Sequence, residues 1–305
     1  MQEKFLKLIS DSKISLDQLR TFLVLGRLEH LTKASEELYL SQAAVSQQLK
    51  TLEKNLGVQL FERQGRRIYL SSVGKSLMQP CLEVLLSVQV VEELANSYKG
   101  LELGTLSIAA SHTVGIHWLP KNLAPFADSY KGIEIKVELD NSETALKRLI
   151  DGYVDCAIIE GKIPYDTLDT LIVEQDVLVA AVSANHELAK LENIDSKDLL
   201  NYRYLSREPG SGTEALAARV IGPSYKKGSV YEFGGAEAIR SAILAGMGYG
   251  VISKTIIEND LINNSIIIME LNRPSVSRKF KAVRRKGNKI PSLESFWEHL
   301  SKLSF

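Results

Sequence analysis

Residues 32–70 read TKASEELYLSQAAVSQQLKTLEKNLGVQLFERQGRRIYL, and this stretch predicts two short helices joined by a tight turn and followed by a basic β-hairpin. Ser41 is a favourable N-cap for the second helix, and Gly57 is a favourable residue for ending it. Its apolar residues recur at helical spacing and share one face: Val45, Leu49, Leu52 and Leu56. The pattern therefore predicts an amphipathic helix over residues 42–56.

The opposite face of this helix carries small, polar and cationic residues and no carboxylate. At about 100° per residue, that face presents Ala43, Gln47, Lys50 and Lys54, with Ser46 at its flank. Residues 42–76 hold six Lys or Arg against two Glu, a net charge of +4. Such a surface can approach the phosphates that line a DNA major groove.

The flanking segments complete a helix-turn-helix with a basic wing. Thr32 is expected to cap the first helix, and Ala34 is small enough to let the two helices cross closely. Gln64-Gly65 suits a tight turn, which would gather three arginines at the hairpin tip: Arg63, Arg66 and Arg67. The alternative is a helical hairpin with an ordinary solvated charged face, and the added wing favours DNA binding over it.

This region resembles LysR-type transcriptional regulators. The resemblance rests on ISLDQLRTF at 14–22, LTKASEEL at 31–38, LSQAAVSQQL at 40–49, LE at 52–53, LGV at 56–58 and LFER at 60–63. The chain length and the pattern beyond residue 100 match the family as well. The sequence departs from the family at two positions: Ala43 stands where the family often has Pro, and Gln47 where it often has Arg. Both departures concern base preference and not the fold.

The resemblance implies an α/β protein with an all-α-type winged helix-turn-helix N-terminal domain, a long linker helix and a bilobed, Rossmann-like effector domain of the periplasmic-binding-protein type. It implies binding of double-stranded DNA at an interrupted inverted repeat, a homodimer assembling into a homotetramer, and RNA polymerase as a further partner. The expected DNA-binding residues are Thr32, Gln42, Ala43, Ser46, Gln47, Lys50, Arg63, Arg66 and Arg67.

The expected division of the chain begins with an N-terminal extension at residues 1–13. The DNA-binding domain then covers 14–71, and the linker helix with its hinge covers 72–102. One effector lobe is expected at 103–175 plus 272–305, and the other at 176–271.

Composition excludes several classes of protein. The chain has 305 residues and zero formal net charge, so affinity for DNA must come from a local patch. Its two cysteines, Cys81 and Cys156, offer no disulfide framework and no metal-ligand spacing. No apolar run is long enough to span a membrane, and the N-terminus does not read as a signal peptide. We therefore expect a cytoplasmic protein.

Residues 72–99 predict one long helix with an apolar seam. The seam residues alternate three and four apart: Val73, Leu77, Cys81, Val84, Val88, Val91, Ala95 and Tyr98. The seam pairs either with a second copy of the chain, which the resemblance favours, or with the helix's own domain. Pro80 is expected to bend the helix, and residues 100–104 are expected to act as a hinge.

Beyond residue 104 the pattern alternates strands and helices, which predicts a mostly parallel sheet with helices on both faces. Two α/β lobes connected by two crossings would form a cleft. The expected strands are 105–110, 133–140, 155–159, 176–183, 229–233, 250–253 and 280–283, with a crossing near 266–271. The expected helices are 120–130, 143–151, 213–221, 235–245 and 292–303.

Three groups of polar residues follow predicted strands, where open α/β sheets hold their ligands. Each group taken alone is better explained as a turn with a helix cap that binds nothing. Together they stand where the resembling family holds its effector: Ser111, His112, Thr113, Asn141, Ser142, Arg207, Ser211 and Thr213. Glu214, where related sequences often carry Arg, weakens the case for a highly charged anionic effector.

Enzyme interpretations find little support. Ser111-His112 lacks an Asp placed to orient the His, and His112 and His117 lack the spacing of a helical zinc pair. The glycines of residues 246–250 are better explained by close packing than by nucleotide binding. We expect no cofactor beyond a small-metabolite effector. The alternative function is a small-molecule-binding protein or enzyme with an incidental helical N-terminus.

Overall fold

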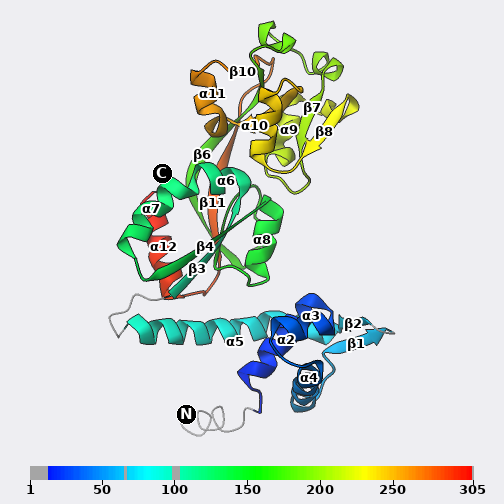
Figure 1. Cartoon of the computed structure of the whole chain (residues 1–305), viewed down its shortest axis with the longest axis vertical. Helices are drawn as coiled ribbons and strands as arrows, with labels where there is room; N and C mark the ends of the chain where they lie inside the picture. Colours follow the sequence, from blue (N-terminus) through cyan, green and yellow to red (C-terminus); the bar gives the residue numbers. More distant parts are fainter. Residues whose placement is uncertain (1–12, 65–66, 98–103, 304–305) are drawn as a thin grey trace. The chain divides into compact units, whose positions relative to one another are not determined.

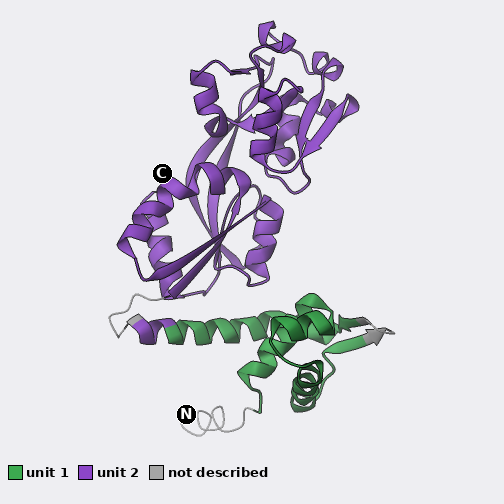
Figure 2. Cartoon of the chain, in the orientation of Figure 1, with its two compact units in different colours: residues 1–92 green, residues 93–305 purple. Residues whose placement is uncertain are grey.

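The computed structural model describes residues 13–64, 67–97 and 104–303, without the side chains of residues 63, 64, 67 and 97. The chain divides into two compact units, residues 1–92 and residues 93–305 (Figure 2). The predicted N-terminal extension falls almost wholly outside the described residues, as does the predicted hinge apart from Gly104.

The first unit is the predicted helix-turn-helix with a wing (Figure 1). Ser41 caps α4 by accepting a hydrogen bond from the Ala44 N–H, and Gly57 ends it with a positive φ of 72°. The hairpin follows, and all these elements pack on one apolar core that includes the fully buried Ala34. The elements are α2 Leu16–Leu28, α3 Leu31–Glu37, α4 Gln42–Leu56, β1 Phe61–Gln64 and β2 Arg67–Leu70.

One local prediction in this unit was wrong. Thr32 does not cap α3, because His30 is extended and its side chain accepts from the Lys33 N–H, so the helix begins at Leu31. Gln64 is the last residue of β1 and pairs with Arg67, as a tight turn requires. The turn itself lies outside the described residues.

The long helix α5, Ser72–Ser97, contains Pro80 without ending there. Part of its predicted seam packs within its own unit, since Leu77 and Cys81 join the apolar core. Val84 and Val91 on the same seam are exposed at 45% and 66%. Packing on its own domain therefore holds for Leu77 and Cys81, and pairing with a second copy stays a prediction for the exposed part of the seam.

The second unit is built on one nine-stranded sheet with the order β4-β3-β5-β11-β6-β9-β7-β8, and β10 pairs with β6. The prediction of a mostly parallel sheet was wrong. Two parallel sets are separated by long strands β6 and β11, which pair antiparallel with each other and with their other neighbours. The strands are β3 Gly104–Ser111, β4 Ile133–Asp140, β5 Cys156–Glu160, β6 Leu168–Ser183, β7 Tyr204–Arg207, β8 Val230–Phe233, β9 Tyr249–Ser253, β10 Ile266–Ile268 and β11 Val276–Arg285.

The two parallel sets define two lobes, with β6 and β11 passing between them (Figure 1). The first lobe, built on β3–β5, carries α6 His112–His117, α7 Leu119–Ser129, α8 Ser142–Ile150 and α12 Pro291–Ser301. The second lobe, built on β7–β10, carries α9 Glu214–Ile221, α10 Ala236–Leu244 and α11 Glu258–Ile262. Each lobe has its own buried apolar clusters. No helix in the described part of the chain is both long and apolar enough to cross a bilayer.

Candidate functional site

The outer face of α4 presents the residues predicted to read DNA. Gln42, Ala43, Gln47 and Lys50 are exposed, and Ser46 is half-buried. Gln42 Nε2 donates to Thr32 Oγ1 at 3.3 Å, so the two helices of the motif share a polar contact on this surface. Gln47 Nε2 lies 3.5 Å from Thr51 Oγ1 and is held only loosely. Arg66 and the side chains of Arg63 and Arg67 lie outside the described residues.

The hairpin is attached to α4 through Glu53. Its Oε1 accepts from the Leu60 N–H at 2.8 Å and from the Phe61 N–H at 3.3 Å. This carboxylate is therefore held against the backbone at the start of the hairpin. Ser46, Lys50 and Glu53 line a groove of about 610 Å³ between α4 and the hairpin.

In the second unit, the polar residues predicted after β3 lie at the start of α6. Ser111 caps the helix, and Thr113 beside it is only 1% exposed. Thr113 Oγ1 and His112 Nδ1 are buried and have no hydrogen-bond partner in the described structure. The His112 ring faces the second lobe, because a Cβ built on Gly235 would lie 3.4 Å from His112 Cδ2.

Residues predicted after β4 reach from the first lobe to the second. Asn141 caps α8, and its Nδ2 donates to the Pro209 carbonyl at 3.2 Å. The Glu143 N–H donates to the Gly210 carbonyl at 3.2 Å. On another pair of elements, His117 Nε2 lies 2.6 Å from Glu237 Oε1 of α10. The lobes are thus in direct polar contact through two pairs of segments.

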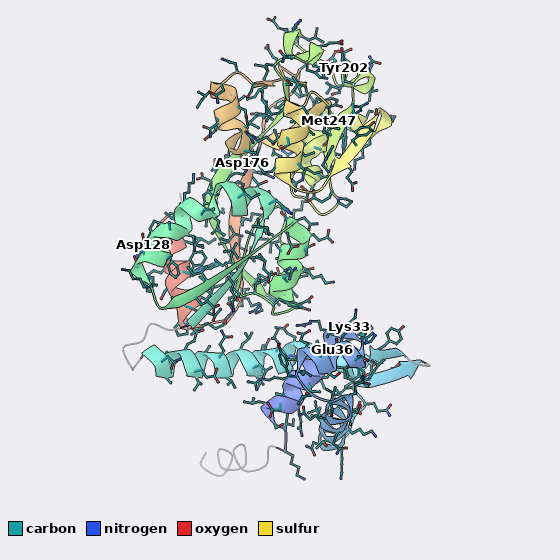
Figure 3. The ribbon with its side chains drawn as sticks, in the orientation of Figure 1. Lys33, Glu36, Asp128, Asp176, Tyr202 and Met247 are labelled. Carbon is teal, nitrogen blue, oxygen red and sulfur yellow. The ribbon has the colours of Figure 1, made fainter. Side chains whose placement is uncertain are left out.

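A buried group of three charges, which we name the cleft cluster, lies where the lobes meet: Glu160, Asp176 and Arg278. Arg278 Nη1 lies 3.1 Å from Glu160 Oε1, and its Nε donates to Asp176 Oδ2 at 2.7 Å. All three side chains are at most 3% exposed. Asp176 is labelled in Figure 3 on β6, between the two lobes.

The cleft cluster connects to residues from both lobes. Ser142 Oγ of the first lobe donates to Glu160 Oε2 at 3.1 Å. Thr213 Oγ1 of the second lobe accepts from Arg278 Nη1 at 2.9 Å. The predicted residues Ser142 and Thr213 are therefore brought together through charged residues that the sequence analysis missed.

Arg207 is placed differently from the expectation of a ligand-binding cation. It is buried, and its guanidinium donates twice to the Glu208 carboxylate, at 2.8 Å each. Burial alone would raise the pKa of Glu208, but hydrogen bonding with Arg207 and its positive charge outweigh burial and lower it. The positive charge of Arg207 is thus already compensated within the protein.

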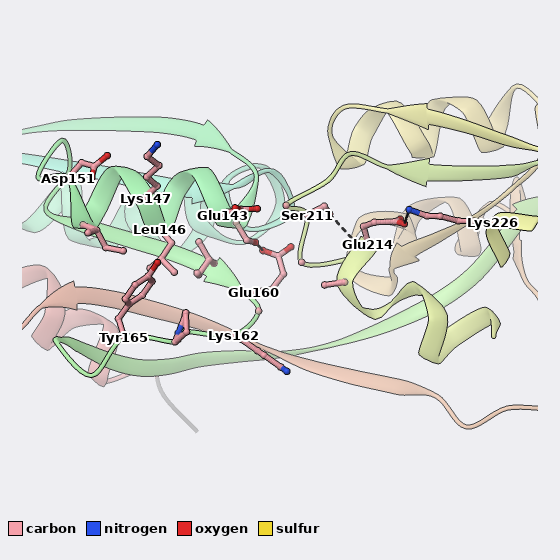
Figure 4. Close-up of a pocket in the computed structure, with 18 of the residues that line it drawn as sticks. Glu143, Leu146, Lys147, Asp151, Glu160, Lys162, Tyr165, Ser211, Glu214 and Lys226 are labelled. Carbon is pink, nitrogen blue, oxygen red and sulfur yellow. Dashed lines mark hydrogen bonds and ion pairs between the residues drawn. The ribbon is translucent and has the colours of Figure 1, made fainter. Parts of the chain in front are cut away.

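A cavity of about 810 Å³ opens beside the cleft cluster (Figure 4). Its walls are one side of α8 with both polar and apolar residues, the segment from Ile159 to Tyr165, the turn from Gly210 to Ala215, and Tyr225 with Lys226. Of the eight predicted effector residues, Ser142 and Ser211 line this cavity, and Glu160 stands at its inner wall. Its size is that of a small-molecule site.

Glu214, also on the cavity wall, is fully engaged within the second lobe. Its carboxylate accepts from the hydroxyls of Tyr204 and Tyr225 at 3.2 and 2.8 Å, and Lys226 Nζ lies at 2.8 Å. Burial is the main cause that raises the pKa of Tyr204, and the negative charge of Glu214 raises it further. Tyr204 therefore keeps its proton and remains a hydrogen-bond donor. Glu214 thus shapes the wall without offering a free charge.

The described residues offer no metal centre and no activated thiol. They contain no group of three His, Cys, Asp or Glu side chains that could hold a metal ion. Burial raises the pKa of the Cys156 thiol to about 12, and burial also raises the pKa of Cys81. A thiol reacts through its thiolate, so neither residue is placed as a nucleophile.

We accordingly expect Cys156 in the native protein to resist alkylation by iodoacetamide at about pH 8. Its rate of alkylation should be at least about a hundredfold lower than in the urea-unfolded chain. The raised pKa and full burial of the thiol both act in this direction. Mass spectrometry of quenched time points measures the rate. Equal rates in the native and unfolded protein would contradict the inert placement of this thiol.

Comparison with known proteins agrees with this architecture. Residues 16–75 match the family model described as "Bacterial regulatory helix-turn-helix protein, lysR family", and residues 99–304 match "LysR substrate binding domain". The HTH-type transcriptional activator CmpR of Synechocystis is 29% identical over 290 residues, covering 94% of this chain and 94% of CmpR.

Two solved structures share the fold over nearly the whole chain. A full-length OxyR variant from Pseudomonas aeruginosa has a TM-score of 0.72 at 22% identity, covering 96% of this chain and 95% of its own. Full-length LysG from Corynebacterium glutamicum, with bound effector Arg, has a TM-score of 0.67 at 23% identity, covering 95% and 98%.

Proposed function

Because the chain belongs to the LysR family of transcriptional regulators, we propose that it reads an operator through α4 and the hairpin and responds to a small metabolite held between its two lobes. As a member of this family it is a DNA-binding transcriptional regulator with an effector-binding domain, and not an enzyme. What we propose beyond family membership is the way in which the chain reads its operator and holds its metabolite.

The exposed face of α4 supports the DNA-binding half of the proposal. The N-terminal residues of a recognition helix meet base edges in the major groove. Gln42, Ser46 and Gln47 lie in the first two turns of α4, and Lys50 follows on the same side. Phosphate contacts then fall to the hairpin arginines and to Thr32, while Ala43 allows close approach.

The observation that carries the effector half is a set of buried polar atoms without partners: Thr113 Oγ1, His112 Nδ1 and Arg278 Nη2. Buried polar atoms are nearly always hydrogen-bonded, so these three atoms together support a bound molecule as their missing partner. α6, which carries Thr113, contacts the short helix Lys254–Ile257, whose Thr255 hydroxyl lies 3.4 Å from Asp176. These atoms therefore belong to the region where the lobes meet.

Effector control requires a ligand whose affinity differs between two arrangements of the lobes. The hydrogen bonds from Asn141 and Glu143 to residues 209 and 210 form in one such arrangement. A metabolite in the adjoining cavity would stabilise or oppose it, and so bias the placement of the DNA-binding domains.

Assembly and location complete the proposal. The exposed Val84 and Val91 of α5 fit pairing with a second copy of the helix, as in a coiled coil. We place the homodimer on an inverted repeat, because a two-fold protein matches a two-fold operator. We further propose assembly to a tetramer, contact with RNA polymerase and a cytoplasmic location, as expected for a regulator of this family.

The experiment that tests this function measures binding of the full-length protein to the region upstream of its gene. Gln47→Ala should cost roughly 1–3 kcal/mol at one base pair per half-site and relax base preference there. Quantitative gel shifts on the operator, on single-base variants and on random DNA give the comparison.

Gln79→Ala serves as the matched control. Gln79 is also an exposed helical glutamine with an i+4 side-chain contact, at 3.2 Å to Glu83, but it lies on α5. It should bind operator as wild type does. Equal losses on operator and random DNA for Gln47→Ala would assign it a positioning role, and no sequence-selective binding by wild type would refute the proposed function.

A further inference from the structure

The charges that line the cavity differ in how firmly they are held. Lys147 and Lys162 are exposed, and Figure 4 shows Lys147 pointing away from the inner wall. Lys226 is bound to Glu214. Glu160, in contrast, has a side chain only 3% exposed and is fixed by Ser142 and Arg278. Exposed charges are screened by water and salt, whereas a buried charge acts on a ligand at nearly full strength.

The cleft cluster behind Glu160 carries an excess of negative charge. Two carboxylates, Glu160 and Asp176, share the single guanidinium of Arg278. Of the other cations, Arg207 is compensated by Glu208, and the half-buried Lys281 donates through its Nζ to the Gly161 carbonyl at 2.8 Å. An anion at Glu160 would therefore meet the excess negative charge of the cleft cluster and give up its hydration for little attraction.

Glu160 also has room to accept further hydrogen bonds. A carboxylate offers about four acceptor positions, and the contacts found here use one on each oxygen, from Arg278 and from Ser142. A ligand group with several N–H donors and a positive charge would satisfy the remaining acceptor positions and the charge of Glu160, whereas the unpartnered Arg278 Nη2 needs an acceptor atom elsewhere on the ligand.

We propose that the cavity takes a ligand bearing a protonated amine or guanidinium, which binds Glu160, and that it discriminates against dianions. This inference rests on the proposed function, since it concerns the effector of the same regulator. Glu160 is then the residue that determines the charge class of the effector, while Ser211 and the apolar wall around Leu146 and Ile159 contact the rest of the molecule.

Three four-carbon probes of matched length test the charge preference: 1,4-diaminobutane, 1,4-butanediol and succinate. Calorimetric titration of the full-length protein without DNA, at low salt, measures each Kd. We expect the diamine to bind at least about tenfold more tightly than the other two. Glu160→Gln keeps a hydrogen-bonding side chain for Ser142 and Arg278, and it should abolish the preference.

Glu258→Gln is the control, because Glu258 is an exposed glutamate of the same unit that does not line the cavity. It should change the diamine Kd less than about threefold, as expected for a screened charge. Tighter binding of succinate, equal binding of all three probes, no binding of any probe up to about 10 mM, or an unchanged preference in Glu160→Gln would each overturn the proposal. The gel shifts test the proposed function separately, because they measure DNA binding without any ligand.

Discussion

Replacing Arg278 by Met is expected to lower the free energy of unfolding of the residue 93–305 unit by about 3–5 kcal/mol. The substitution removes the single cation between Glu160 and Asp176, which lie 3.1 and 2.7 Å from it. Two nearly fully buried carboxylates would then face each other without a counter-charge, and Thr213 would lose its donor. Breaking a buried ion pair from one side costs more than the pair itself contributes.

Urea unfolding followed by tryptophan fluorescence measures this effect selectively. The chain has two tryptophans, Trp118 and Trp297, and both belong to the residue 93–305 unit. Trp118 is almost completely buried, so its emission should report unfolding of the first lobe. The DNA-binding unit contributes no tryptophan signal.

Two further variants separate lost charge from lost packing. Arg219→Met replaces an exposed arginine of α9 and should change stability by less than about 0.5 kcal/mol. The triple variant Arg278→Met, Glu160→Gln, Asp176→Asn removes all three charges and should recover much of the loss. A loss below about 1 kcal/mol in Arg278→Met, or no recovery in the triple variant, would contradict the ionic role of the cleft cluster.

The parts predicted from sequence are those whose signals are local. α4 was predicted with its N-cap and its last turn because Ser41 and Gly57 act on residues within one turn of themselves. The N-cap of α3 was missed by two residues, because His30 is a weaker N-cap than Thr32 by residue preference. Its extended backbone, which decides the cap, cannot be read from residue type.

The parts that were missed depend on partners far apart in the chain. Asp176 and Arg278 are separated by 102 positions, and Arg278 and Thr213 by 65. The one signal available was a charged residue within or at the end of an otherwise apolar strand, as with Glu160 after residues 156–159. A charge at such a position requires partners, but the sequence does not identify them.

The sheet prediction failed for a related reason. Residues 168–175 mix charged and apolar residues and give a weaker strand signal than residues 176–183, yet both belong to β6. The first half of β6 is a strand because β11 pairs with it along its length, from Arg285 with Leu168 to Val276 with Leu178. Pairing between distant segments thus overrides local preference.

Gly212→Ala is expected to force the turn at residues 210–213 away from the first lobe. A Cβ at this position would lie 2.5 Å from the Glu160 carbonyl oxygen and 2.7 Å from Glu160 Cγ. The carbonyl belongs to the end of β5, so neither it nor the turn can yield without backbone movement. Forcing an extra methyl into such a contact typically costs about 1–3 kcal/mol.

Displacement of this turn should be visible at the hydrogen bonds between the lobes. The Glu143 N–H donates to the Gly210 carbonyl, so its hydrogen exchange should become faster in Gly212→Ala. The Asn141 contact with Pro209 lies on the same turn and should be lost with it. Hydrogen-exchange mass spectrometry measures the first effect, and thermal unfolding followed by tryptophan fluorescence measures the accompanying loss of stability.

Gly234→Ala is the matched control, because a Cβ at Gly234 meets no atom within 4 Å. It should leave both exchange at Glu143 and thermal stability near the wild-type values. Operator binding by α4 should persist in both variants, since these glycines lie in the other compact unit. If Gly212→Ala were as stable and as well protected at Glu143 as Gly234→Ala, the turn would not be held against β5.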